Sequence, residues 1–339
     1  MRIGIVVGFT STLAAVSSPS TAAEQPHAFY AGKHITIVVG LPPGGGADAY
    51  ARLVQHYLPR HIEGAPTVVV QNMPGAGSLK SVTYLNTTAP ADGTVIATFS
   101  SALIEEALTA PERVKVDFRG YKWIGNVSED VRVCYVWGAS GVKNWQDMIG
   151  RQKALFMGAT APGTAGNADT AMLQHLFGVK IRQVQGYAGS ADKRLAVERH
   201  EIDGDCGGWT AVPDDWLRDK KINVVVRLSP TLVAGMDKNV PFGGDLVKNE
   251  RDRKLYDFLI APERLGRLFM VSDKVPAVRV AILRAAFDAM IADPAFRAEA
   301  QRLKLLVAPM TGDEVARRIA ELYATPADIR ASAKAILGQ

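Results

Sequence analysis

Short apolar runs that read as buried strands alternate with helical patterns along this sequence, and this alternation limits the fold more than any other feature. Strand runs at 35–39, 67–72 and 94–99 are separated by helical patterns at about 48–58 and 78–86. Further strand runs follow at 131–136, 153–157 and 181–185. This order is typical of α/β proteins, in which a largely parallel sheet is flanked by helices.

The spacing of these runs predicts two lobes, each a sheet flanked by helices. One β/α layer lies before residue 130, a second spans 130 to 227, and the tail from residue 273 reads as four helices. A chain of 339 residues is long enough for two domains of ordinary size. We assign 28–128 together with 228–339 to lobe 1, and 129–227 to lobe 2.

The N-terminal segment differs from the rest of the chain. Arg2 is followed by an apolar run at 3–16 and then by small residues up to Ala23. This order predicts a secretory signal peptide at 1–23. The alternative is a transmembrane anchor, but the apolar run is shorter than the roughly 18–20 residues that a spanning helix needs. We therefore expect an exported protein.

Charge and side-chain patterns argue against several function classes. The net charge of +5 is spread along the chain, without the basic block typical of nucleic-acid-binding proteins. The six histidines show no H-E-x-x-H spacing, and no G-x-S-x-G motif is present. We predict no catalytic residue, metal, cofactor or nucleic-acid partner. Cys134 and Cys206 could form a disulfide or could be two unrelated buried thiols.

A glycine-rich loop follows the first strand run. Its candidate ligand contacts are Pro43, Gly44, Gly45, Gly46, Ala47 and Asp48. Glycines let the backbone approach a ligand closely, and the next helix points its free N–H groups and positive dipole end at the same place. We expect an anion site, with Asp48 able to cap the helix. A nucleotide site is the alternative, although the spacing matches neither G-x-G-x-x-G nor a P-loop, and a purely structural turn also remains open.

A second loop of similar chemistry lies between a strand run and a helix in the predicted lobe 2. Its candidates are Thr160, Gly163, Thr164, Ala165, Gly166 and Asn167. Two such loops could hold one anion from opposite sides. Ser100, directly after the third strand run, is a further candidate, and the loop at 72–78 either binds similarly or only shapes a turn. Four to six donors of roughly 1.5–3 kcal/mol each reach the about 8 kcal/mol of micromolar binding without an arginine.

Several segments, taken in their order along the chain, resemble the Bug-type solute receptors of tripartite tricarboxylate transporters. The segments are 35–48, 69–77, 91–94, 186–189 and 201–203, and the likeness spans the mature chain. It implies a type II periplasmic-binding (Venus-flytrap) fold that binds a small organic carboxylate through backbone amides and waters and delivers it to membrane transporter subunits. The implied contacts are 43–48 in lobe 1, and 160–167 with Tyr187, Gly189 and Asp192 in lobe 2.

The sequence departs from the family pattern at places that bear on the ligand. Gly40 stands where the family usually has proline, and Ala188 where it has lysine. The loop at 161–167 lacks the usual serines and following histidine. The ligand class is therefore left open among dicarboxylates, aromatic acids and branched acids, with Trp209 as a candidate stacking surface for an aromatic or branched acid.

We accordingly predict a monomeric periplasmic receptor. The alternatives are an exported α/β hydrolase-like enzyme, for which no nucleophile–base pair is recognisable, and a ligand-presenting accessory of a signalling receptor. The fold also suggests that Cys134 and Cys206 lie near the strands that cross between lobes. If those strands are neighbours, a disulfide would staple the hinge.

Overall fold

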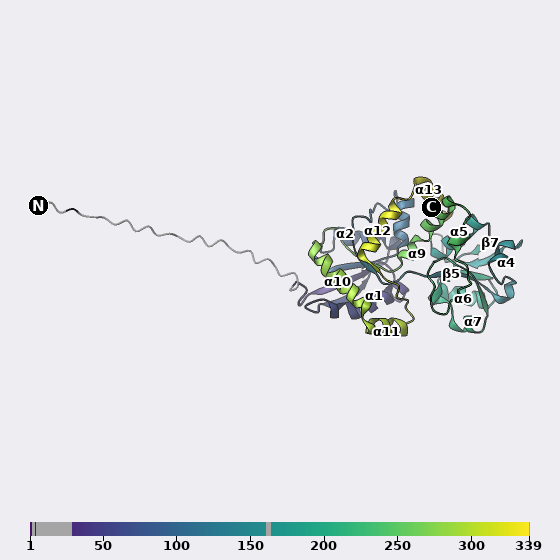
Figure 1. Cartoon of the computed structure of the whole chain (residues 1–339), viewed down its shortest axis with the longest axis horizontal. Coiled ribbons are helices and arrows are strands. Elements are labelled where there is room, and N and C mark those ends of the chain that lie inside the picture. The colour runs from purple at the N-terminus through teal and green to yellow at the C-terminus, as the bar shows by residue number, and fades with distance from the viewer. Residues whose placement is uncertain (2–3, 5–28, 161–163, 339) are drawn as a thin grey trace.

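The computed structural model describes residues 1, 4, 29–160 and 164–338, so most of the predicted signal peptide lies outside the described residues. Two lobes lie side by side, each built on a mixed sheet (Figure 1). The two-lobe α/β architecture predicted from the alternation of strands and helices is therefore confirmed.

The first sheet has parallel β1, β2 and β3, so the loops that follow these strands gather at one edge. In spatial order its strands are β11 (Met310–Thr311), β4 (Lys122–Asn126), β10 (Leu268–Val271), β3 (Val95–Thr98), β1 (His34–Val39) and β2 (Thr67–Asn72). Because β10 runs antiparallel to β3, its amino end lies at this same edge. The first lobe's helices are α1 (Gly46–Tyr57), α2 (Leu79–Thr87), α3 (Ala102–Thr109), α9 (Ala261–Leu265), α10 (Ala277–Ala292), α11 (Pro294–Arg302) and α12 (Gly312–Tyr323).

The second sheet repeats this logic. In spatial order its strands are β7 (Ile181–Val184), β6 (Leu155–Gly158), β8 (Gly204–Gly208), β5 (Arg132–Trp137) and β9 (Ile222–Arg227). Since β6 is parallel to both β7 and β8, the loops after all three lie at one edge, together with the amino end of antiparallel β5. Its helices are α4 (Trp145–Gly150), α5 (Ala165–Phe177), α6 (Ser190–Glu198) and α7 (Asp214–Arg218).

A short connecting segment, residues 127–131, joins the two sheets at these edges. It leads from the carboxyl end of β4 to the amino end of β5. The amide of Arg267 donates to Ser128 O at 2.8 Å, and the amide of Trp209 donates to Val131 O at 2.7 Å, so the segment is bonded to both lobes. The loop-bearing edges of the two sheets therefore face each other across it.

Two helices from the C-terminal half pack with the second lobe. Buried side chains of α8 (Glu250–Leu259) and α13 (Ala327–Leu337) share a core with α5, as Tyr256 and Ile329 do with Leu173. The Tyr256 hydroxyl also donates to Leu228 O at 2.8 Å. The predicted division placed all of 228–339 in lobe 1. We propose instead that 228–259 and α13 belong with lobe 2, because their apolar faces are buried there.

Cys134 and Cys206 form a disulfide, with their sulfurs 2.05 Å apart. The two residues are directly opposite in the β5–β8 pair, so the strands are neighbours. Both strands belong to the second sheet, however, and the bond lies in that lobe's core. The disulfide therefore fastens two strands of one lobe, and the predicted stapling of the hinge between lobes is wrong.

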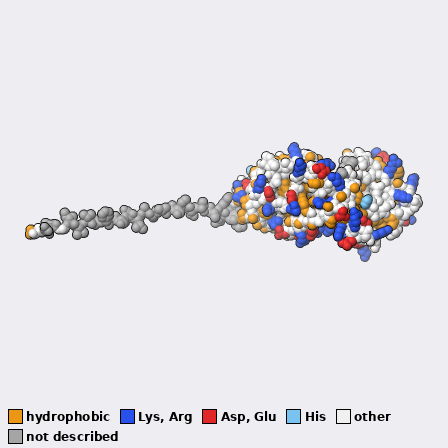
Figure 2. Space-filling view, turned by 90° about the horizontal axis from the view of Figure 1, so that it is seen from above, with side chains coloured by type: hydrophobic (Ala, Val, Ile, Leu, Met, Phe, Trp, Pro, Cys, Tyr) orange, Lys and Arg blue, Asp and Glu red, His pale blue; other side chains and the backbone are white. Residues whose placement is uncertain are grey.

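Over the described residues, none of the helices is both long and apolar enough to cross a bilayer. The face shown in Figure 2 carries Lys and Arg interspersed with Asp and Glu, rather than gathered in one stripe.

Candidate ligand site at the facing edges of the two sheets

The glycine-rich loop after β1 leads into the first turn of α1. Residues 42–46 are exposed, whereas Ala47 and Asp48 are buried. Gly45 is the N-cap residue and has no side chain to bond to the N–H groups of the first turn. These N–H groups have no partner within the helix, so they are donors at the positive end of the helix dipole. The glycine-rich loop lies between a strand and a helix as predicted, but Asp48 does not cap the helix, because the N-cap residue is Gly45.

The Asp48 side chain stabilises this loop through hydrogen bonds. Its carboxylate accepts from the amide of Gly44 at 3.0 Å, from Arg52 Nε at 2.8 Å and from Asn72 Nδ2 at 3.0 Å. The hydrogen bond from Arg52 is the main reason that the pKa of Asp48 is lowered to about 2. Asp48 is therefore ionised, and its carboxylate stabilises the loop through these protein partners.

Ser78 ties together the loops after the first three strands. Its hydroxyl donates to Gly40 O at 2.9 Å and accepts from the amide of Ser100 at 3.1 Å. A Cβ on Gly40 would lie 2.4 Å from Ser81 Oγ, so a larger residue does not fit there. Ala76 and Ser78 have φ of 45° and 82°, in the left-handed region. The loop at 72–78 thus shapes a strained turn that supports its neighbours.

The second-lobe loop is built around the start of α5. Thr160 Oγ1 donates to Thr164 Oγ1 at 3.0 Å, and the amide of Gly186 donates to Thr160 O at 3.1 Å. These bonds bring the loops after β6 and β7 together. Ala165 and Gly166 begin the helix, so their N–H groups belong to its first turn. The predicted contact Gly163 lies outside the described residues.

Asn167 has a structural partner in the neighbouring strand. Its buried side-chain amide donates to Gln183 Oε1, and Gln183 Nε2 donates back to Asn167 O at 3.2 Å. These bonds fasten α5 to β7. A Cβ on Gly166 would lie 3.1 Å from Cys206 O, which explains why glycine stands where α5 approaches β8.

Two buried ion pairs lie beneath the first turn of α5. Neither pair was predicted from the sequence. Arg132 Nε donates to Asp169 Oδ2 at 2.7 Å, and Lys193 Nζ lies 2.6 Å from Asp205 Oδ1. All four side chains are less than a tenth exposed. Removing one partner would leave an uncompensated buried charge, so the pairs fix the helix and strands that carry the loop.

The remaining second-lobe candidates lie at the same edge with different surroundings. Tyr187 and Trp209 are half-buried against a cluster that includes Val133 and Trp216. Gly189 is the N-cap residue of α6, and Asp192 is exposed in its first turn. Trp209 Cζ2, at the edge of the ring, lies 3.8 Å from the position that a Cβ on Gly235 would occupy.

Arg267 is a cation at this site that was not predicted from the sequence. Its Nη2 lies 3.3 Å from the position that a Cβ on Gly46 would occupy, at the start of α1. It is 3.9 Å from Asp130 Oδ2, and the side chain is 26% exposed. Arg267 precedes β10, and only the antiparallel placement of β10 beside β3 brings it to the glycine-rich loop.

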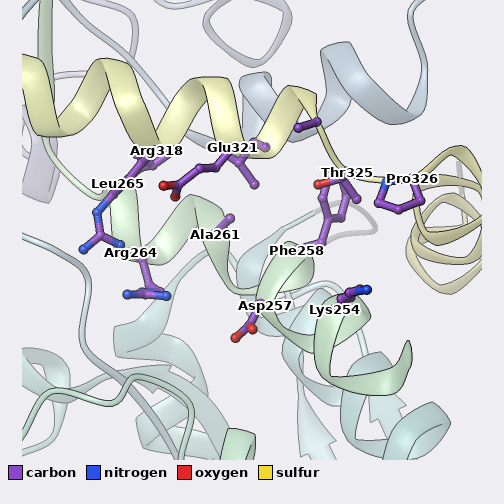
Figure 3. A pocket seen from close by; sticks show the side chains of 12 residues that line it. Lys254, Asp257, Phe258, Ala261, Arg264, Leu265, Arg318, Glu321, Thr325 and Pro326 are labelled. Carbon is purple, nitrogen blue, oxygen red and sulfur yellow. The ribbon is translucent and has the colours of Figure 1, made fainter. Parts of the chain in front are cut away.

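A partly open cavity of about 360 Å³ lies away from these loops, between α8, α9, α12 and the start of α13 (Figure 3). In the described part of the chain, no three His, Cys, Asp or Glu side chains converge as metal ligands would.

No protein-family model matches this sequence, and no curated protein matches it. Several solved structures have a similar fold. A TctC solute binding protein from Polaromonas aligns with TM-score 0.71 and 18% identity, over 90% of this chain and 98% of that chain. The periplasmic binding protein BugD aligns with TM-score 0.65 and 18% identity, over 89% and 97%. Rpa4515 of R. palustris, solved with adipate, aligns with TM-score 0.66 and 17% identity, over 89% and 97%. At these identities the likeness establishes the fold, so this chain has the two-lobe α/β fold of these periplasmic binding proteins.

Proposed function

We propose that the protein is a periplasmic solute receptor that binds a small organic carboxylate between the facing sheet edges and delivers it to a tripartite-tricarboxylate-type membrane transporter. The observation that carries this proposal is the presence of two helix N-termini, those of α1 and α5, at the two facing edges. Each supplies first-turn amides and the positive end of a helix dipole, which together favour an anion.

Arg267 adds a positive charge beside the first of these helices, and the nearest carboxylate oxygen to it, from Asp130, is at 3.9 Å. A guanidinium can donate two parallel hydrogen bonds to one carboxylate, which fixes the orientation of the ligand as well as its charge. Asp48 does not cancel this charge, because its carboxylate is already paired with Arg52 at 2.8 Å. We therefore assign the ligand carboxylate to the space between Gly46 and Arg267 on one side and the start of α5 on the other.

The two-lobe fold supports a receptor that works by closing around its ligand. The connecting segment 127–131 joins the lobes, as do the links from α8 to α9 and from α12 to α13. Ligand binding would shift an open–closed equilibrium about these crossings. We further propose that the protein acts as a monomer without a cofactor. The predicted signal peptide and the disulfide both suit an oxidising compartment outside the cytoplasm.

The test is a thermal-shift and calorimetric titration of the mature protein with adipate, succinate, benzoate and isobutyrate. We expect one class of acid to raise the Tm, since a ligand at a hundredfold excess over its Kd stabilises the folded state by about 2.7 kcal/mol. The acid should be recovered chemically unchanged. No shift with any acid, or conversion of the acid, would contradict the proposal.

Arg267→Gln tests the site itself. A lost charged hydrogen bond is worth roughly 1.5–3 kcal/mol, so affinity for the bound acid should fall about ten- to a hundredfold. Arg119→Gln is the control, because Arg119 is an exposed arginine of the first lobe that pairs with Asp117 at 2.7 Å. If both variants bind like the parent protein, the carboxylate lies elsewhere.

Trp209→Ala should weaken the binding of benzoate selectively if that ring stacks on the ligand.

A further inference from the structure

The cavity behind the facing edges has the size of a small-molecule site. Its volume of about 360 Å³ falls within the range of ligand pockets. Figure 3 shows its walls, formed by α8, α9, α12 and the turn before α13. Phe258, Ala261 and Leu322 supply an apolar lining, and charged side chains stand around it.

Most of the charged side chains that line this cavity already have ion-pair partners. Lys254 pairs with Glu250 at 2.8 Å, and Asp257 pairs with Arg253 at 3.0 Å. Glu321 makes a longer contact with Arg317, at 3.9 Å. Each of these contacts is formed within a single helix, between residues four apart, so the cavity does not need a ligand to balance these charges.

Arg264 and Arg318 differ from these paired side chains. They come from α9 and α12, and Figure 3 shows their guanidinium groups next to each other on the same side of the cavity. Within the described part of the chain, neither has an ion pair at 4 Å or less, and the buried Nε of Arg318 has no acceptor. Burial and then the charge of Arg264 lower the pKa of Arg318, while Glu321 and Glu129 oppose this effect.

The two neighbouring guanidinium groups repel each other, and the buried Nε of Arg318 loses hydration without a hydrogen bond in return. One oxyanion placed between them would accept hydrogen bonds from both and neutralise the repulsion. We propose that this cavity is a second binding site, separate from the facing edges, that takes a small oxyanion such as inorganic phosphate or a carboxylate. Arg264 and Arg318 are its anion-binding residues, and the apolar lining accommodates the rest of an organic anion.

The test uses calorimetric titration of the mature protein with inorganic phosphate and, separately, with succinate. We expect millimolar or tighter phosphate binding to the parent protein that falls at least tenfold in Arg264→Gln/Arg318→Gln. Arg302→Gln is the matched control, because it removes an exposed arginine that pairs with Glu299 at 2.7 Å outside the cavity. The control should bind phosphate like the parent protein. Binding of succinate but not phosphate would restrict the site to carboxylates.

Arg267→Gln separates this site from the proposed receptor site. Phosphate binding should persist in that variant and be lost in the double variant. The reverse pattern, or no phosphate or succinate binding by the parent protein, would overturn the inference while leaving the receptor proposal to its own test.

Folding is checked by the Tm without anion, which should stay the same or rise in the double variant because the repulsion is removed. Arg318→Lys, which keeps the charge but not the planar fork, should bind with intermediate affinity.

Discussion

At the scale of single residues, the carboxyl group of Glu263 is buried at the junction between the lobes. Glu263 lies on α9, and its main-chain oxygen accepts from the amide of Asp130 in the connecting segment at 2.8 Å. Its Oε2 is buried and has no hydrogen-bond partner in the described part of the chain. Burial, followed by the negative charge of Asp169, raises the pKa of Glu263 to about 8, against the opposing charge of Arg132.

This shift predicts how the stability depends on pH. The folded protein binds the Glu263 proton more tightly than the unfolded chain, whose glutamates titrate near 4.5. The contribution of Glu263 to stability is therefore complete below about pH 4.5 and is lost as the pH rises through about 8. Glu263→Gln cannot ionise, so its Tm should exceed that of the parent protein by a few degrees at pH 8.5 and match it near pH 4.5.

The measurement is a series of thermal melts from pH 4.5 to 9. Glu198→Gln, at an exposed position on α6, is the control and should follow the parent protein at every pH. A Tm difference for Glu263→Gln that grows as the pH falls would show that the carboxyl is stabilised as an anion instead.

At the scale of elements, β8 is a central strand with an unfavourable composition. Its sequence, Gly204–Gly208, contains three glycines, which are poor strand formers. A Cβ on Gly204 would lie 2.1 Å from Tyr135 O, so the close approach of β5 requires glycine there. The disulfide to β5 and the ion pair from Asp205 to Lys193 fasten β8 to β5 and α6.

The disulfide should therefore contribute substantially to stability. It closes a loop with a sequence separation of 72, for which a contribution of about 2–4 kcal/mol is typical. Cys134→Ala/Cys206→Ala should lower the Tm by roughly 5–10 °C, and reducing the parent protein should have a similar effect. Reductant should not change the melting of the double variant. Two free thiols in the denatured, unreduced parent protein would contradict the bond.

At the scale of the whole molecule, the lobes also touch at an exposed point. Lys304 Nζ lies 2.6 Å from Asp214 Oδ2, joining the segment after α11 in the first lobe to α7 in the second. Both side chains are about three-quarters exposed. Because the pair bridges the lobes, it forms only while these surfaces are together, and an exposed pair adds little free energy.

If the protein closes around its ligand as proposed, breaking this pair should weaken binding slightly. Lys304→Gln is expected to lower affinity for the bound acid about two- to fivefold at low salt, because the closed form loses one attraction. The difference should shrink at 0.5 M salt, where exposed charges are screened. Asp219→Asn, which breaks the Arg218–Asp219 pair within the second lobe, is the control. Tighter binding by Lys304→Gln would mean that the pair holds the open form.

Much of the fold follows from local patterns in the sequence. The strand runs predicted at 67–72 and 181–185 fall on β2 and β7, and the four helices predicted in the tail from residue 273 correspond to α10, α11, α12 and α13. Local periodicity decides these elements, because each is formed by residues close in the chain. The glycine-rich loops directly follow strand runs in the sequence, so their positions after strands are local features as well. The glycine strand β8 and the short β10 and β11 carry too weak a pattern to be predicted.

What the sequence by itself determined is therefore the alternation of elements and the glycine-rich loops that follow strands of each sheet, one of which leads into α1. The tertiary structure alone decided which distant side chains meet there. Arg267 reaches Gly46 only because β10 pairs beside β3, and Arg264 meets Arg318 only because α9 packs near α12. The lobe that α8 and α13 join was likewise decided by packing. Contacts between distant residues depend on how elements pack, and no local periodicity encodes that.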